Sequence, residues 1–116
     1  MIEVLLERNG SGSLVRCKAE GHSEYAAKGF DIVCASVSVL MKTTLRMLEK
    51  TSGIELELDA PNRGFLSFEI KNTGLEEERL VFAGDFLVTG LEAVHEEFPD
   101  NLKLCIKYFE ASPRQE

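Results

Sequence analysis

Long uncharged runs are absent from this sequence. The longest uncharged segment, residues 32–41, is well short of the ~20 residues that a membrane-spanning helix needs. Residues 1–8 include a glutamate at position 3 and only a short apolar run, which is not the pattern of a signal peptide. We therefore expect a cytoplasmic protein that does not insert into a membrane.

Basic residues are also in short supply. Thirteen lysines and arginines stand against 20 aspartates and glutamates, which gives a formal net charge of -7. A protein that binds the phosphate backbone needs a basic face, so we expect no direct contact with nucleic acid. An acidic surface attracts a basic partner, although the same charge also serves plain solubility.

Cysteine is scarce as well, and no Cys-x-x-Cys pair occurs among Cys17, Cys34 and Cys105. Zinc knuckles and thioredoxin-type redox sites need such pairs, so we expect neither of these two kinds of site. In the cytoplasm the three cysteines should remain free thiols.

What is present is enough apolar material for one packed domain. The chain has 116 residues, of which 44% are hydrophobic and 28% charged, the profile of a globular protein. Typical domains contain ~100–150 residues. We expect a single domain over residues 1–111, followed by a short polar tail at residues 112–116.

Alternating apolar and polar residues predict five strands, four of which form two hairpins. Residues 2–8 and 14–19 flank Asn9-Gly10-Ser11-Gly12, a strong turn sequence. Residues 54–59 and 66–71 flank a second turn. The fifth strand covers residues 102–108.

Helical spacing predicts two helices, over residues 32–52 and about 75–98. Asp31 is a suitable N-cap for the first helix, and Gly53 a suitable residue after its end. Its apolar stripe consists of Val33, Val37, Leu40, Met41, Met47 and Leu48. The order β-β-α-β-β-α-β predicts an α+β two-layer sandwich, in which both helices cover one face of a mostly antiparallel sheet.

Cys34 is the best candidate for chemistry. With Asp31 as N-cap it is the third residue of the helix, where unpaired amides and the helix dipole favour a negative charge. The same amides are suited to hold the oxyanion of a tetrahedral intermediate. Cys17 and Cys105 lie in the middle of predicted strands and lack such surroundings.

A cysteine nucleophile also needs a partner that moves protons, and the sequence has two histidines. His22 opens the segment that leads to Cys34, whereas His95 lies late in the second helix beside acidic residues. If Cys34 has a base, His22 is the better candidate. Two plainer interpretations stay open at this point. Cys34 is an inert core residue, or the loop ahead of the helix binds an anion without catalysis.

Three short segments around these residues form one pattern: Gly21-His22-Ser23, Gly29-Phe30-Asp31-Ile32-Val33-Cys34-Ala35 and Val37-Ser38. They resemble the signature of the ribosomal-processing cysteine protease family Prp, which has a Gly-His-Ala start, a Gly-x-Asp-Ile-Val-Cys-Ala centre and a Val-Ser end. Ser23 replaces the usual alanine. The spacing of the segments, the chain length and the order of elements also fit the family.

The resemblance implies a cysteine endopeptidase that needs neither a metal nor another cofactor. It would remove a short N-terminal extension from the precursor of a bacterial large-subunit ribosomal protein, the twenty-seventh of the set, by cleavage after an aromatic residue. Cys34 is the implied nucleophile and His22 the implied general base. Gly21, Asp31 and Ser38 also match family positions, as supporting or substrate-contacting residues. Because family members are homodimers, we expect a homodimer whose substrate is a basic ribosomal protein precursor.

Two other functions use the same residues differently. One is a non-catalytic, ribosome-associated module that keeps the fold and binds a basic protein. The other is a redox-responsive protein in which Cys34 is oxidised reversibly. The presence of both His22 and Cys34 disfavours the first, and the lack of a resolving cysteine nearby disfavours the second.

Overall fold

The seven elements occur in the predicted order. The structure, a computed structural model, describes residues 1–21, 30–61 and 64–109, apart from the side chains of residues 30 and 31. The elements are β1 (Ile2–Arg8), β2 (Leu14–Gly21), α1 (Phe30–Glu49), β3 (Glu55–Asp59), β4 (Phe65–Asn72), α2 (Glu77–Glu97) and β5 (Leu102–Tyr108).

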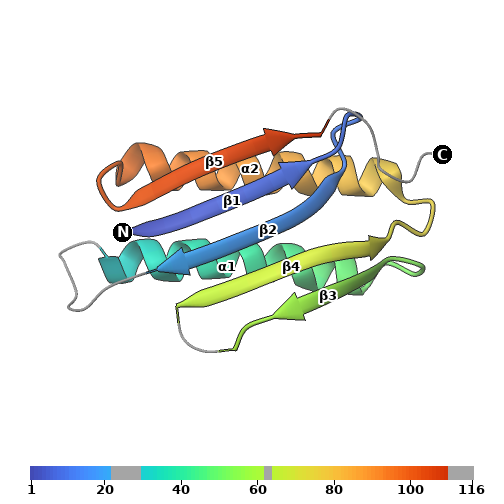
Figure 1. Cartoon of the computed structure of the whole chain (residues 1–116), viewed down its shortest axis with the longest axis horizontal. Coiled ribbons are helices and arrows are strands. Elements are labelled where there is room, and N and C mark those ends of the chain that lie inside the picture. The colour runs from blue at the N-terminus through green and yellow to red at the C-terminus, as the bar shows by residue number, and fades with distance from the viewer. Residues whose placement is uncertain (22–29, 62–63, 110–116) are drawn as a thin grey trace.

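The strands form one sheet in the order β3-β4-β2-β1-β5. Adjacent strands are antiparallel except β1 and β5, which are parallel. Both helices cover the same face of the sheet, as Figure 1 shows. The predicted α+β two-layer sandwich is therefore confirmed.

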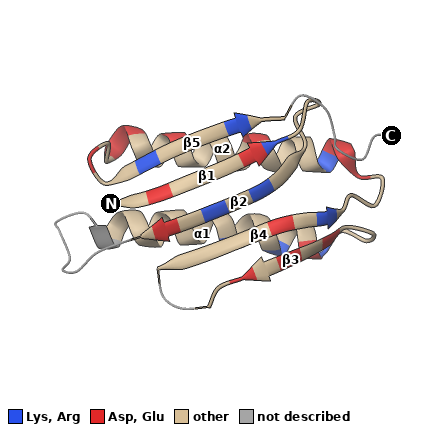
Figure 2. Ribbon diagram, viewed as in Figure 1, with Lys and Arg blue, Asp and Glu red and all other residues tan. Residues whose placement is uncertain are grey.

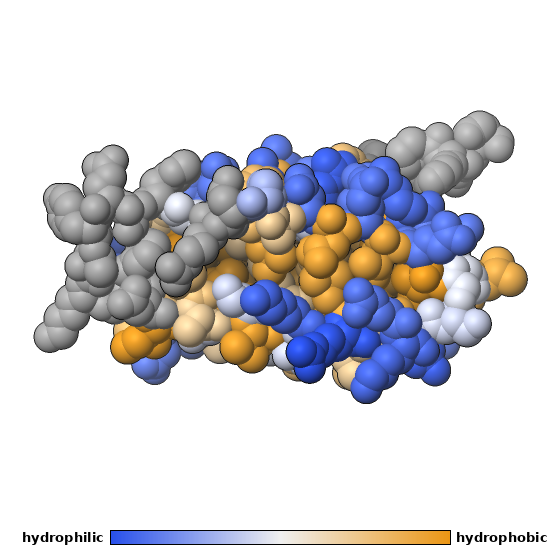
Figure 3. All heavy atoms as spheres, turned by 90° about the horizontal axis from the view of Figure 1, so that it is seen from below, coloured by the Kyte–Doolittle hydropathy of each residue, from blue (hydrophilic) through white to orange (hydrophobic). Residues whose placement is uncertain are grey.

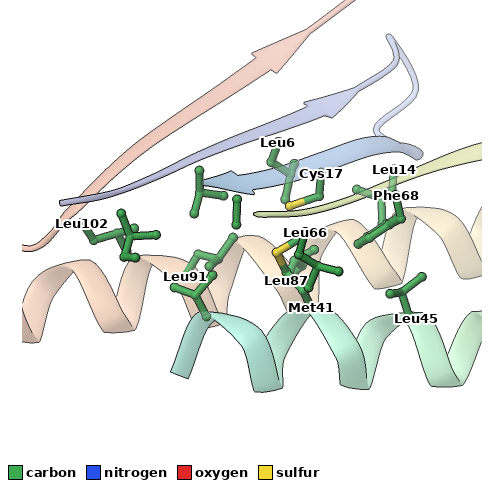
Figure 4. Packing of buried hydrophobic residues seen from close by; sticks show 14 of the residues in the cluster. Leu6, Leu14, Cys17, Met41, Leu45, Leu66, Phe68, Leu87, Leu91 and Leu102 are labelled. Carbon is green, nitrogen blue, oxygen red and sulfur yellow. The ribbon is translucent and has the colours of Figure 1, made fainter. Parts of the chain in front are cut away.

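The core lies between the sheet and the two helices. Leu6 of β1 is opposite Cys17 of β2, and both are fully buried. Their side chains point toward Met41 of α1 and Leu87 of α2, which are also fully buried (Figure 4). Alternate residues of each strand thus contribute to the core, as their period of two predicts.

The predicted apolar stripe of helix α1 is buried in most positions, but the prediction that Met47 belongs to it is wrong. Val33, Val37 and Met41 are at most 2% exposed, whereas Met47 is 58% exposed. Leu45, which the predicted stripe omits, is buried instead. The stripe is therefore rotated toward the Leu45 side, which faces the sheet (Figure 4), whereas Met47 lies beside the groove between the two helices.

The start of α1 also differs from the prediction. The helix begins at Phe30, so Asp31 lies inside it and not before it, and Cys34 is the fifth helical residue instead of the third. Aspartate is favourable both at the N-cap and in the first turn, so the sequence alone does not separate the two positions. The helix ends at Glu49, and Gly53 lies a few residues beyond its end with φ of +92°.

Helix α2 runs without a break through Gly84 and Gly90. A Cβ atom at Gly90 would lie 2.6 Å from Cδ2 of Leu40 on α1, and one at Gly84 would lie 2.9 Å from Cζ of Arg8 on β1. Both glycines therefore allow close approach of neighbouring elements. Neither helix is long and apolar enough to cross a membrane, as far as the described residues go.

Candidate functional site

A cleft of about 370 Å³ opens between the first half of α1, the end of β2 and the start of β4. It contains three of the residues that the sequence singles out, Gly21, Cys34 and Ser38. The full lining consists of Ile2, Ala19, Glu20, Gly21, Cys34, Val37, Ser38, Met41, Lys42, Ala60, Gly64, Phe65 and Leu66.

One wall of the cleft is a single side of α1. Cys34, Ser38 and Lys42 follow each other at intervals of four residues, which places them one above the other along the helix. Val37 and Met41 are buried between this row and the sheet, and Cys34 is half-buried and packs against the core. The helix therefore holds a thiol, a hydroxyl and an ammonium group along one side of an open cleft.

The opposite wall is made where β2 ends and β4 begins. The amide of Gly21 donates a hydrogen bond of 2.8 Å to the carbonyl oxygen of Gly64. Gly64 has φ of +87°, and a Cβ atom there would lie 3.1 Å from the oxygen of Gly21. Glycine at position 64 thus permits this contact, which fixes the end of β2 beside the start of β4.

The structure places three of the five predicted site residues in the cleft. It brings Gly21, Cys34 and Ser38 to one cleft. It describes Asp31 only as a backbone position in the first turn of α1. His22 directly follows Gly21 in the chain and lies outside the described residues.

The other two cysteines have different surroundings. Cys17 is fully buried in the core, and burial raises the pKa of its thiol to about 12. Cys105 is exposed on β5 and does not line the cleft. All three are free thiols, and only Cys34 combines partial burial with access to a cleft.

Lys42 and Phe65 line the cleft but were not predicted as site residues. Lys42 follows Cys34 by two helical turns, and this spacing was a usable sequence signal that the two side chains share one side of the helix. Phe65 is the first residue of β4, and no sequence pattern links it to α1. Within the described ranges, no group of three or more His, Cys, Asp or Glu residues is arranged to hold a metal ion.

A half-buried thiol on a helix, open to a cleft, can be reached by a bound substrate, as a cysteine nucleophile must be. A family model described as "Cysteine protease Prp" matches residues 1–103. The chain therefore belongs to the Prp family of ribosomal processing cysteine proteases.

Two curated relatives carry the name ribosomal processing cysteine protease Prp. The protein of Bacillus subtilis is 24% identical over 109 residues, which cover 90% of this chain and 96% of the relative. The protein of Staphylococcus aureus is 23% identical over 108 residues, which cover 92% of this chain and 100% of the relative. Both alignments thus extend over nearly the whole domain.

Solved structures share the fold. Prp of S. aureus in complex with a substrate peptide has a TM-score of 0.80 at 19% identity, and covers 92% of this chain and 100% of that one. The same protease with a covalently linked product peptide has a TM-score of 0.73 at 23% identity, with the same coverage. A protein of Streptococcus mutans has a TM-score of 0.72 at 25% identity, over 93% of this chain and 98% of that one.

Proposed function

We propose that this protein is an endopeptidase that removes a short N-terminal extension from the precursor of a bacterial large-subunit ribosomal protein, the twenty-seventh of the set, by cleavage after an aromatic residue. Cys34 is the nucleophile and His22 the general base. The observation that carries this proposal is the position of Cys34, half-buried in the wall of a cleft that also contains Gly21, the residue before His22. The names of the relatives agree with the substrate class.

The first step is the attack of the Cys34 sulfur on the carbonyl carbon of the scissile bond, with transfer of the thiol proton to His22. Side chains of a helix lean toward its N-terminus, so the sulfur of the fifth helical residue leans over the first turn. The first four backbone N–H groups of a helix have no acceptor within it. These groups are suited to donate hydrogen bonds to the oxyanion.

The second step releases the two products. His22 returns the proton to the departing amine, which leaves a thioester between Cys34 and the N-terminal fragment. Water then hydrolyses the thioester and frees the enzyme. No step needs a metal or another cofactor.

The remaining predicted residues support this pair. Gly21 fixes the end of β2, and so the point from which His22 continues, through its hydrogen bond to Gly64. Ser38 lies one helical turn beyond Cys34 along the cleft, within reach of a bound peptide. Asp31 belongs to the first turn of α1, next to the proposed oxyanion donors.

The overall charge suits the proposed substrate. A ribosomal protein is basic, and this chain has a formal net charge of -7. Opposite charges raise the rate of encounter. We place the reaction in the cytoplasm, with no direct contact between the protease and nucleic acid.

We also propose that the protein is a homodimer whose interface is the outer face of the helix layer. A groove of about 610 Å³ lies between α1 and α2, beside Met47, Phe82 and Phe86, which are 58%, 73% and 43% exposed. A fully buried aromatic side chain removes ~150–250 Å² from water, so the exposed fractions of the two phenylalanines together still offer roughly 200 Å² of apolar area. That is a substantial part of the ~800 Å² per partner in a standard interface.

The test is intact-mass analysis of the ribosomal protein precursor after incubation with this protein and with its Cys34→Ala and His22→Ala variants. We expect the parent protein to remove the extension after an aromatic residue, and both folded variants to leave the precursor intact. A Cys105→Ala variant is the matched control and should retain activity, because Cys105 does not line the cleft. A precursor that binds but is never cut would favour the non-catalytic module instead.

A further inference from the structure

We propose that the free edge of β3 binds an extended segment of the substrate as an additional strand, in which basic and apolar residues alternate. This inference rests on the proposed endopeptidase function and adds a docking surface next to the cleft. In this mode, main-chain hydrogen bonds provide affinity and alternate side chains provide specificity.

Strand β3 is the last strand of the sheet and pairs only with β4. Alternate residues of an edge strand direct their N–H and C=O groups away from the sheet, where another strand can accept them. Among the residues that the structure describes, none makes a backbone hydrogen bond to this outer edge of Glu55–Asp59. An added segment would therefore meet unpaired main-chain groups.

The helix-facing row of β3 is apolar and incompletely covered. Leu58 lies opposite Phe68 of β4, yet Leu58 is 50% exposed whereas Phe68 is 1% exposed. Figure 3 views the molecule from the side on which β3 and α1 lie, and hydrophobic residues there run between two hydrophilic bands. Apolar residues of an added strand would extend the row that contains Leu56 and Leu58, and so cover both.

The opposite row of β3 is acidic. Glu57 and Asp59 are exposed, and Glu57 lies opposite Glu69 of β4 (Figure 2). The Nζ atom of Lys71 lies 3.7 Å from Oε1 of Glu57 and 3.5 Å from Oε1 of Glu69, so one ammonium group serves two carboxylates. Arg16 and Lys18 of β2 line the same shallow hollow as Glu57 and Asp59, but Arg16 pairs with Glu7, and β4 separates both cations from the free edge. At the edge itself the carboxylates of Glu57 and Asp59 outnumber the Lys71 ammonium group, so this side of β3 complements lysine and arginine side chains.

The edge also continues into the cleft. Asp59 is followed by Ala60, which lines the cleft together with Cys34. A peptide that leaves the cleft at Ala60 and runs toward Glu55 is antiparallel to β3. Because the removed extension is short and N-terminal, most of the basic substrate lies on the C-terminal side of the scissile bond. We therefore assign this edge to the residues that follow the scissile bond.

The first test compares two peptides with the same cleavage segment, one of which continues with a tail of alternating lysine and valine. We expect the tail to lower KM about tenfold, an effect within the range of a few charge pairs. The double variant Glu57→Lys/Asp59→Lys should cleave the short peptide with the parent's KM, and the tail should no longer lower its KM. The double variant Glu92→Lys/Glu96→Lys changes the net charge equally on α2 and should keep the gain.

The second test separates strand pairing from general charge attraction. Tails are N-methylated at either of the two alternating sets of amides, and their binding to the Cys34→Ala variant is measured by fluorescence anisotropy. An added strand uses only one set, so one methylated tail should bind as well as the parent tail and the other should not. Equal binding of the two methylated tails, or a tail that changes neither KM nor binding, would overturn the proposal.

The two proposals fail in different ways. Cleavage of the short peptide without any benefit from the tail would leave the endopeptidase function intact and remove the docking edge. If no peptide is cut, the endopeptidase function fails, and the binding measurement still decides whether the edge takes a strand.

Discussion

The three cysteines show how position determines the chemistry of identical side chains. Cys17 is enclosed by the core, Cys105 is exposed on β5, and Cys34 is half-buried beside a cleft. A nucleophile needs both contact with a substrate and a controlled environment, which only Cys34 has. The assignment of Cys34 therefore stands on its surroundings as well as on the sequence motif.

The buried thiol of Cys17 should make stability depend on alkaline pH. Its pKa is raised from 9.0 to about 12, so above pH 9 the unfolded chain loses this proton while the folded chain keeps it. The free energy of unfolding should therefore fall between pH 9 and about 12, by up to ~1.4 kcal/mol per pH unit from this group.

Chemical denaturation below and within this window checks the prediction. A Cys17→Ala variant should be less stable at neutral pH, because it leaves a small cavity. It should also lose less stability than the parent over the alkaline window. Equal losses in the two proteins would show that the Cys17 thiol is not the source.

At the scale of elements, the buried Arg8 side chain connects β1 to the first turn and to α2. Its Nε atom donates to the oxygen of Gly12 at 2.8 Å, and its Nη2 atom donates to the oxygen of Val81 at 3.0 Å and to Oδ1 of Asp85 at 2.7 Å. A Cβ atom at residue 84 would lie 2.9 Å from the guanidinium carbon, too close for both to keep their positions. The hydrogen bonds leave the guanidinium group little freedom to move.

This arrangement predicts that Gly84→Ala destabilises the protein, although alanine favours a helix by about 1 kcal/mol over glycine. Overpacking of this kind costs ~1–3 kcal/mol. In an Arg8→Ala background the clash is absent, so the same substitution should raise stability. Thermal or denaturant unfolding of the parent, the two single variants and the double variant measures both effects. A Gly84→Ala variant that is more stable than the parent would contradict the role of Arg8.

Much of the element pattern was predictable from local sequence. The bounds of β1 and β5 are the predicted ones, because alternation and turn residues mark both clearly. The pairing of β2 with β4, and of β1 with β5, was not predictable, since it depends on contacts between distant segments. The predicted position of Met47 was wrong for the same reason, as a helical stripe does not show how much of it the sheet covers.

The candidate site was predictable in part. The motif identified Gly21, Cys34 and Ser38, which the structure brings to one cleft. The far wall with Phe65 depends on how β4 packs beside β2, and no local pattern encodes that. His22 stays a prediction, because it lies outside the described residues.

For the whole molecule, the exposed groove between the helices predicts association. Phe82→Asp places a charge in the proposed interface and should convert the dimer to a monomer, as measured by analytical ultracentrifugation. Leu75→Asp is the matched control, because Leu75 is 91% exposed but lies outside the groove. A parent protein that is monomeric at every concentration, or equal effects of the two variants, would contradict the interface.

The proposed mechanism depends on a covalent bond between Cys34 and the substrate. The most direct measurement is rapid quenching of the reaction with a precursor peptide, followed by intact-mass analysis and mapping of the adduct. We predict an adduct on Cys34 with the mass of the N-terminal fragment less one water, and neither adduct nor cleavage with Cys34→Ala. An adduct on Cys105, or cleavage by the Cys34→Ala variant, would contradict this mechanism.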